Sequence, residues 1–125
     1  IISRRSHYYD LWRDFINGAY RLYVTNDIID EYEEILSTKT TPHIAKLVCE
    51  IILRAPNTVM LDAHFRWGLI ESDPDDNKFV DCAIVANANF IVSEDGHFNV
   101  LKHISFPHVN VIKLSEFDEL MSKYR

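Results

Sequence analysis

The feature that most constrains this sequence is a helix-like segment that runs directly into a short apolar strand. Residues 76–88 carry apolar side chains at helical spacing, and residues 90–92 form an apolar run typical of a buried parallel strand. A helix that leads into a parallel strand places its own N-terminus and the strand's carboxyl end at the same sheet edge. Asp76 opens the helix and Asp95 follows the strand, so both carboxylates are expected at the edge where open α/β sheets bind ligands.

Two carboxylates at one sheet edge suggest a site for a hard cation, because Mg²⁺ and Mn²⁺ prefer oxygen ligands. A purely structural interpretation of the same residues stays open. Asp73, Asp75 and Asp76 all stand where a helix N-cap belongs, and Asp95-Gly96 is an ordinary turn sequence. The spacing alone does not decide between these two interpretations.

Helix-like and strand-like segments alternate along the rest of the chain. Further helices are expected at residues 6–17, 25–36, 41–54 and 115–121, with a short helix or turn at 98–104. Further strands are expected at residues 20–24, 58–61 and 109–112. This order predicts an α/β fold, a three-layer α/β/α sandwich with a mainly parallel sheet.

Two details of these helices can be compared with a structure. The core side of the helix at 41–54 is expected to consist of its large aliphatic residues, namely Ile44, Leu47, Val48, Ile51 and Ile52. Ser115, with Asp118 three residues later, approximates a capping box for the last helix.

The composition limits what the chain can be. Its length of 125 residues predicts a single domain, residues 1–125, and a hydrophobic content of 47% is enough for one core. No apolar run approaches a membrane span and no signal peptide is visible, so we expect a cytoplasmic protein without a membrane partner. Cys49 and Cys82 have apolar neighbours and are interpreted as free thiols.

The formal net charge of −6 argues against a protein held to nucleic acid mainly by a basic surface. It does not exclude nucleic acid, because bound cations offset the charge of an acidic metal site. The helix that starts near Thr25 adds further acidic residues, with Glu31 and Glu33 at opposite borders of its apolar stripe. The pattern does not choose between them, and a solvated charged face is the ordinary alternative.

Three segments, in this order and at this spacing, carry a family resemblance: residues 25–34, residues 73–79 and residues 89–95. With them the chain resembles the PIN domain superfamily, and most closely the proteins grouped as putative toxin components of toxin–antitoxin systems. The resemblance implies a metal-dependent endoribonuclease that hydrolyses the phosphodiester bonds of RNA. It also implies Mg²⁺ or Mn²⁺ as cofactor, a cognate antitoxin protein as partner, and a homodimer.

Residue by residue, the resemblance assigns three catalytic metal ligands. Glu31 matches the acidic position six residues after a Ser or Thr, here Thr25, and is thereby favoured over Glu33. Asp76 matches the acidic residue that opens the helix before the fourth strand. Asp95 matches the acidic residue after that strand, in a Ser/Thr-x-Asp pattern.

Three other residues are candidates that the sequence does not settle. Asp81 is a second candidate for the helix position and ranks below Asp76, because its distance to Ser93 is shorter than the family's usual spacing. Ser93 belongs to the strand-end pattern. His97, two residues after Asp95, could face a substrate, although a loop histidine at such a place is more often incidental.

One feature of the family has no counterpart in this sequence. Family members begin with a central strand that carries an Asp-Thr-Asn-like sequence, and that strand would lie just before Ile1. The expectation is therefore a chain that is N-terminally incomplete and lacks one ligand carboxylate.

Two other functions stay open at this stage. A PIN-like module could bind an antitoxin or RNA without cutting it. A receiver-like signalling domain also gathers carboxylates at strand ends, and would need a lysine at a late strand end, for which Lys113 is the candidate.

Overall fold

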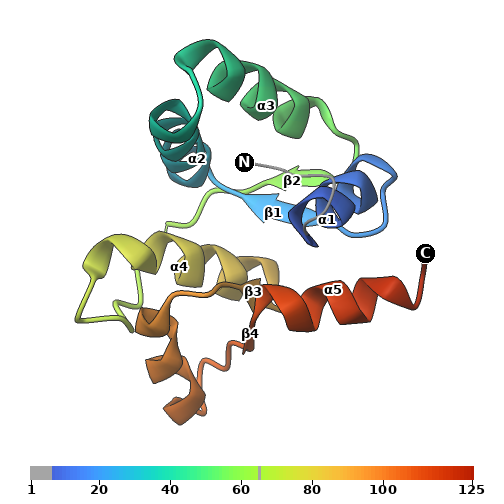
Figure 1. Ribbon diagram of the computed structural model, residues 1–125. Helices are drawn as coiled ribbons and strands as arrows, with labels where there is room; N and C mark the ends of the chain where they lie inside the picture. Colours follow the sequence, from blue (N-terminus) through green and yellow to red (C-terminus); the bar gives the residue numbers. More distant parts are fainter. Residues whose placement is uncertain (1–6, 65) are drawn as a thin grey trace. The chain divides into compact units, whose positions relative to one another are not determined.

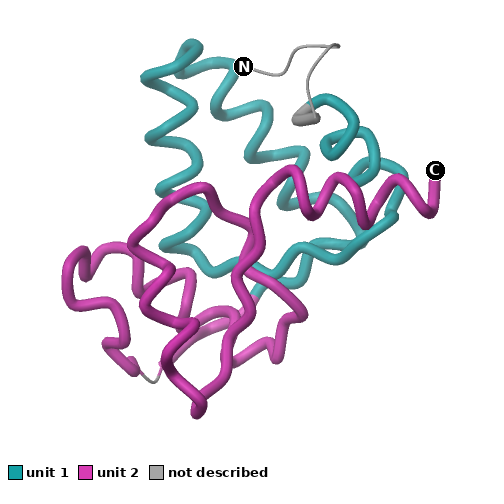
Figure 2. The backbone as a smooth tube through the Cα atoms, turned by 60° about the horizontal axis from the view of Figure 1, so that its bottom comes forward, with its two compact units in different colours: residues 1–60 teal, residues 61–125 magenta. Residues whose placement is uncertain are grey.

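The computed structural model describes residues 7–64 and 66–125, which form two compact units. The first unit spans residues 1–60 and the second spans residues 61–125 (Figure 2). Helices and short strands alternate within both units (Figure 1). The prediction of a single domain over residues 1–125 stays a prediction, because each unit is defined by its own contacts.

The first unit contains α1 (His7–Ile16), β1 (Leu22–Val24), α2 (Asn26–Lys39), α3 (Pro42–Arg54) and β2 (Thr58–Met60). The two strands pair in parallel, with Leu22 opposite Thr58. Threonine side chains begin both long helices, as the sequence predicts. Thr25 Oγ1 accepts a hydrogen bond from the Ile28 amide at 3.3 Å, and Thr41 Oγ1 accepts one from the Ile44 amide at 3.1 Å.

The buried face of α3 agrees with the prediction at Ile52, and Val48 is half-buried, but the other three predicted core residues are exposed. Its buried residues are Ala45, Cys49 and Ile52, while Ile44, Leu47 and Ile51 are 44%, 47% and 45% exposed. Small side chains on the inner face permit close approach to α2, and the Cys49 sulfur lies 4.0 Å from the carbonyl oxygen of Ile29 on that helix. The aliphatic pattern therefore assigns more residues of α3 to the core than the structure buries.

The second unit contains η1 (Pro74–Asp76), α4 (Asn77–Ala86), β3 (Ile91–Val92), η2 (Gly96–His103), β4 (Val111–Ile112) and α5 (Leu114–Ser122). The η elements are 3-10 helices. Strands β3 and β4 pair in parallel, with Ile91 opposite Val111 and Val92 opposite Ile112. Each unit thus has a two-stranded parallel sheet, which agrees with the predicted α/β class. Neither sheet by itself forms the three-layer sandwich that the sequence predicts.

The core of the second unit lies between α4 and η2. Its buried residues come from both elements and from the loops beside them, namely Ile70, Val80, Ala83, Phe98, Leu101 and Val109. The rings of Phe79 and Phe98 add an edge contact, with their centroids 6.4 Å apart. This core fixes the start of α4 against the segment that follows β3.

Two local predictions in this unit are wrong. The run at residues 90–92 is not fully buried, since Phe90 is 38% and Val92 is 36% exposed. The capping interaction of α5 is formed two residues earlier than predicted. The amide of Lys113 donates to Glu116 Oε1 at 2.9 Å, and Asp118 instead forms an ion pair with Arg125.

The state of the cysteines agrees with the prediction from the sequence. Cys49 and Cys82 are both buried free thiols. Within the described ranges, no helix combines the length and the apolar character needed to span a membrane.

Tyr20 provides a test of the first unit's core. Its hydroxyl donates to the Leu11 carbonyl at 2.9 Å, and burial, followed by the charge of Asp14, raises the pKa of Tyr20 from 10.0 to about 12. Because the folded chain holds this proton more tightly, the associated stability is complete below pH 10 and is lost as the pH approaches about 12. Tyr20→Phe should lower the free energy of unfolding by about 1 kcal/mol at neutral pH.

The stability difference between wild type and Tyr20→Phe should then shrink above pH 10, as measured by chemical denaturation at pH 8 and pH 11. Tyr124→Phe is the matched control, since Tyr124 is 79% exposed. A difference that is the same at both pH values would contradict the assigned role of the Tyr20 hydroxyl.

Candidate metal centre

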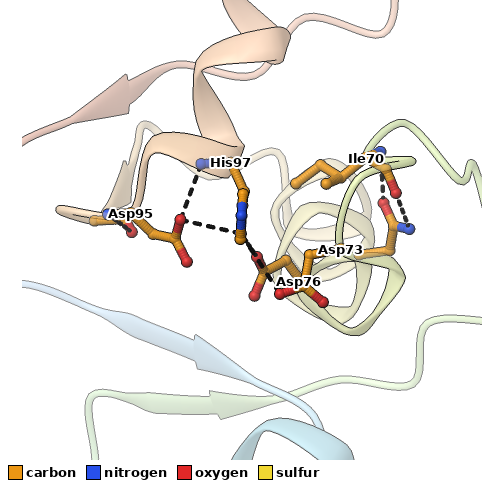
Figure 3. A network of polar contacts seen from close by, with 7 residues as sticks. Ile70, Asp73, Asp76, Asp95 and His97 are labelled. Atoms are coloured by element: carbon orange, nitrogen blue, oxygen red, sulfur yellow. Dashed lines mark hydrogen bonds and ion pairs between the residues drawn. The ribbon is translucent and has the colours of Figure 1, made fainter.

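The N-terminal end of α4 is held in place by one asparagine side chain. Asn77 Oδ1 accepts a hydrogen bond from the Ile70 amide, and Asn77 Nδ2 donates to the Ile70 carbonyl, both at 2.9 Å (Figure 3). Ile70 is 1% exposed, so these two bonds satisfy backbone groups that lie in the core. They tie the preceding loop to the helix start and thereby fix the position of Asp76.

The turn after β3 positions two further side chains. Ser93 Oγ accepts a hydrogen bond from the Asp95 amide at 3.0 Å, and Asp95 Oδ1 accepts one from the His97 amide at 2.9 Å. The Asp95 side chain thus caps η2. Phe98, the next residue, is 4% exposed and anchors η2 in the core. The backbone of His97 is therefore held on both sides.

Three carboxylates converge on the ring of His97. Its Nδ1 atom lies 3.1 Å from Asp95 Oδ1, 3.2 Å from Asp76 Oδ2 and 3.5 Å from Asp73 Oδ2. Figure 3 shows the ring between the Asp95 carboxylate on one side and Asp73 and Asp76 on the other. The helix start and the turn after β3 thus meet at one point.

The carboxylates differ in their exposure to solvent. The side chain of Asp76 is 15% exposed, whereas those of Asp73 and Asp95 are 40% and 43% exposed. Burial raises the pKa of Asp76, its hydrogen bond with His97 lowers it, and the charges of Asp73 and Asp95 raise it further. The pKa of His97 is raised, first by its hydrogen bond with Asp76 and then by the charge of Asp95.

The arrangement suits a divalent cation. Asp73, Asp76 and His97 each offer one ligand atom, and these atoms all lie within 4.8 Å of one another. Neighbouring ligands of an octahedral ion, each about 2.1 Å from the ion, are about 3 Å apart. The separations of 3.2 Å and 3.5 Å between Nδ1 and the two carboxylates are close to that spacing. Three donor atoms at this spacing can share one divalent ion.

Two of the three predicted ligands lie close together. Asp76 and Asp95 are on either side of the same imidazole ring, and their role as metal ligands stays a prediction. Glu31 lies on α2 in the first unit, so its predicted role with the other two stays a prediction. The same holds for the choice of Glu31 over Glu33.

Asp81 has a different place from Asp76, although both belong to the same helical segment. It is 5% exposed, and its Oδ1 accepts a hydrogen bond from the Trp67 amide at 3.2 Å. Burial raises the pKa of Asp81, and the bond from Trp67 partly opposes this effect. The carboxylate therefore holds the loop before α4 and is not part of the cluster around His97.

Two members of the cluster, Asp73 and His97, are not among the ligands that the sequence predicts. The sequence indicates only a possible helix cap at Asp73, three residues before Asp76. A loop histidine at such a place is more often incidental, so the sequence does not favour His97. The spacing Asp-x-His after a strand is the signal available for His97.

The comparisons with known proteins match the chain to one family. A family model described as a PIN domain matches residues 1–97, a range that contains the whole cluster as well as Glu31. PIN domains are commonly nucleases and typically bind divalent metals. No curated protein and no solved structure matches the chain.

Asp81 allows a test of which acidic residue on this segment contributes to the centre. Asp81→Ala should destabilise the chain by about 1–3 kcal/mol, because the Trp67 amide loses its acceptor. Asp81→Asn retains an acceptor oxygen and should change stability by less than about 1 kcal/mol. Thermal denaturation measures both effects, and calorimetry should show unchanged Mn²⁺ affinity in the Asn variant. Weaker Mn²⁺ binding by a stably folded Asp81→Asn chain would make Asp81 a ligand.

Proposed function

The chain belongs to the PIN domain family, and on that basis we propose that it is a metal-dependent endoribonuclease. The reaction is hydrolysis of a phosphodiester bond in RNA. The observation that carries the proposal is the convergence of three carboxylates on one point, 3.1–3.5 Å from His97 Nδ1. A structural ion pair needs one carboxylate at such a position, whereas a cation site needs several.

The roles of the residues follow from their placement. Asp76 is the least exposed carboxylate of the cluster and would bind the cation most rigidly. Asp95 faces it across the His97 ring, and Glu31 is proposed to complete the ligand set. A divalent cation bound there would supply positive charge beside the phosphate oxygens and make a water molecule more acidic. Mg²⁺ and Mn²⁺ are the proposed cofactors.

Hydrolysis replaces one phosphorus–oxygen bond with another. The oxygen of water forms a bond to phosphorus, the bond to the leaving ester oxygen breaks, and that oxygen takes up a proton. The carboxylates of Asp73 and Asp95 are the more exposed ones of the cluster and can accept hydrogen bonds from the attacking water. The same side chains repel a phosphate in the absence of a cation, so cleavage should depend strictly on the metal.

The biological setting is proposed from the family resemblance. We propose that the chain is the toxin of a toxin–antitoxin pair, acts in the cytoplasm, binds a small antitoxin protein, and forms a homodimer. These partners are proposed by analogy with the family. Light scattering on the purified chain, alone and with the neighbouring gene product, distinguishes monomer, homodimer and complex.

A second candidate function is a non-catalytic interaction module. The exposed aliphatic residues of α3, Ile44, Leu47 and Ile51, favour it, because grouped apolar side chains on a surface are typical of protein contacts. The metal-dependent cleavage assay below separates the two functions. The family match gives no support to the receiver-like alternative.

Asp76→Asn should lower the rate of Mn²⁺-dependent RNA cleavage by about 100-fold or more, because a metal ion contributes several kcal/mol to such reactions. Asp76 makes no side-chain cap to α4, so the fold should tolerate the change. Cleavage of a labelled single-stranded RNA, with and without chelator, measures the effect. Asp75→Asn is the matched control, since the Asp75 side chain is 75% exposed and pairs with Lys78.

The control should cleave at nearly the wild-type rate. Cleavage that persists in chelator and in Asp76→Asn would rule out the proposed enzyme. RNA binding without cleavage by the metal-loaded wild type would favour the interaction module.

The choice between the two glutamates on α2 can be tested by a matched pair. Glu31→Gln should weaken Mn²⁺ binding and reduce cleavage by at least about tenfold, because a ligand charge is lost. Glu33→Gln, two residues along the same helix, should leave both close to wild type. Calorimetry and the cleavage assay provide the measurements. The opposite ranking would assign the position to Glu33.

A further inference from the structure

We infer that His97 is itself a ligand of the metal centre, through Nδ1, and that it makes the centre a mixed nitrogen and oxygen site. Such a site selects first-row transition cations, such as Co²⁺ and Mn²⁺, over Mg²⁺. The inference rests on the proposed metal-dependent function and specifies which cation that function uses. Asp73 and Asp76 are the carboxylates that can share a cation with His97, since one ligand atom from each of the three residues lies within 4.8 Å of the others.

The first argument concerns the number of acceptors around Nδ1. Carboxylate oxygens of Asp73, Asp76 and Asp95 lie within 3.5 Å of this atom, which carries at most one hydrogen. One hydrogen can serve only one or two of these acceptors well. A cation bound by the carboxylates would balance the remaining negative charge. Nδ1 would then carry no hydrogen and would bind the cation through its lone pair.

The second argument is the rigid placement of the histidine. Its amide is bonded to Asp95 Oδ1 at 2.9 Å, and Phe98 beside it is packed against Phe79 in the core. An exposed histidine without such constraints would sample many orientations and contribute little. The His97 side chain is 46% exposed, yet its Nδ1 atom faces the carboxylates (Figure 3). Preorganised ligands of this kind favour binding, because the side chains lose little conformational entropy when the cation binds.

The chemistry of the imidazole predicts the selectivity. Mg²⁺ prefers oxygen ligands, holds its waters strongly and demands octahedral geometry. Imidazole nitrogen suits later first-row cations, whose affinities rise from Mn²⁺ to Co²⁺ for a given site. Replacing one oxygen ligand by Nδ1 therefore raises the affinity for Co²⁺ most, for Mn²⁺ less, and for Mg²⁺ least.

The test uses His97→Asn, because the Asn oxygen occupies about the place of Nδ1 and leaves an all-oxygen ligand set. Calorimetry on the full chain with Co²⁺, Mn²⁺ and Mg²⁺ separately gives the affinities. Loss of even an outer partner of a metal ligand weakens binding about 10–100-fold, so Co²⁺ affinity should fall by at least about tenfold. Mg²⁺ affinity should change less than about twofold, so the preference for Co²⁺ over Mg²⁺ collapses.

A spectroscopic readout identifies the nitrogen directly. Pulsed electron paramagnetic resonance of the Mn²⁺-loaded wild type should show coupling to a directly bound ¹⁴N nucleus. This coupling should be lost in His97→Asn and kept in His103→Asn. His103 lies at the end of the same 3-10 helix, is exposed, and is outside the ligand group, which makes it the matched control.

The outcomes separate this inference from the proposed function. Mn²⁺ binding that needs Asp76 but shows no nitrogen coupling would overturn the role of His97 and leave the metal-dependent function standing. The same conclusion would follow if His97→Asn lowered the affinities for all three cations equally. If the wild type bound none of the cations at millimolar concentration, both the inference and the proposed function would fail.

Discussion

The buried face of α4 is the constraint on which the candidate centre depends. Val80 is 0% and Ala83 is 8% exposed, and both pack into the core of the second unit. Asp76 lies one helical turn before Val80 and therefore on the same face. It cannot turn fully to solvent while Val80 stays in the core. The apolar packing thus places one carboxylate at the core's edge, where its side chain is 15% exposed.

The two acidic residues on this helical segment illustrate how packing separates structure from function. Asp81 is buried and accepts a hydrogen bond from the Trp67 amide, so its position is explained by the loop that it holds. Asp76 gains the His97 contact, but burial and two neighbouring carboxylates raise its pKa. A fold gains no stability from such crowding of like charges, and Asp81 has no neighbouring carboxylate among the causes of its pKa shift. That contrast supports a ligand-binding role for Asp76.

The sequence pattern predicts the order of helices and strands well, and the burial and contacts of their side chains less well. The order of helices and strands and the helix starts near Thr25 and Thr41 follow from local signals, and the parallel pairing follows from the alternation of the elements. The full set of buried residues on α3 does not follow from local signals, because small residues on its inner face allow α2 to approach. The predicted capping box of α5 is two residues too late, because the Glu116 side chain, rather than that of Asp118, accepts the hydrogen bond at the helix start, from the Lys113 amide. Propensity does not specify which of several acidic side chains is oriented correctly.

The sequence by itself determined the alternation of elements and the placement of Asp76 and Asp95 at related ends of a helix and a strand. Both follow from periodicity and from the geometry of a helix that feeds a parallel strand. Only the tertiary structure decided that Asp73 and His97 join them and that Asp81 does not. The physical reason is that 3-10 helix η2 docks on α4 through Phe98, Leu101 and the shared core. That docking brings His97 within 3.2 Å of a carboxylate 21 positions earlier, a contact that no local pattern encodes.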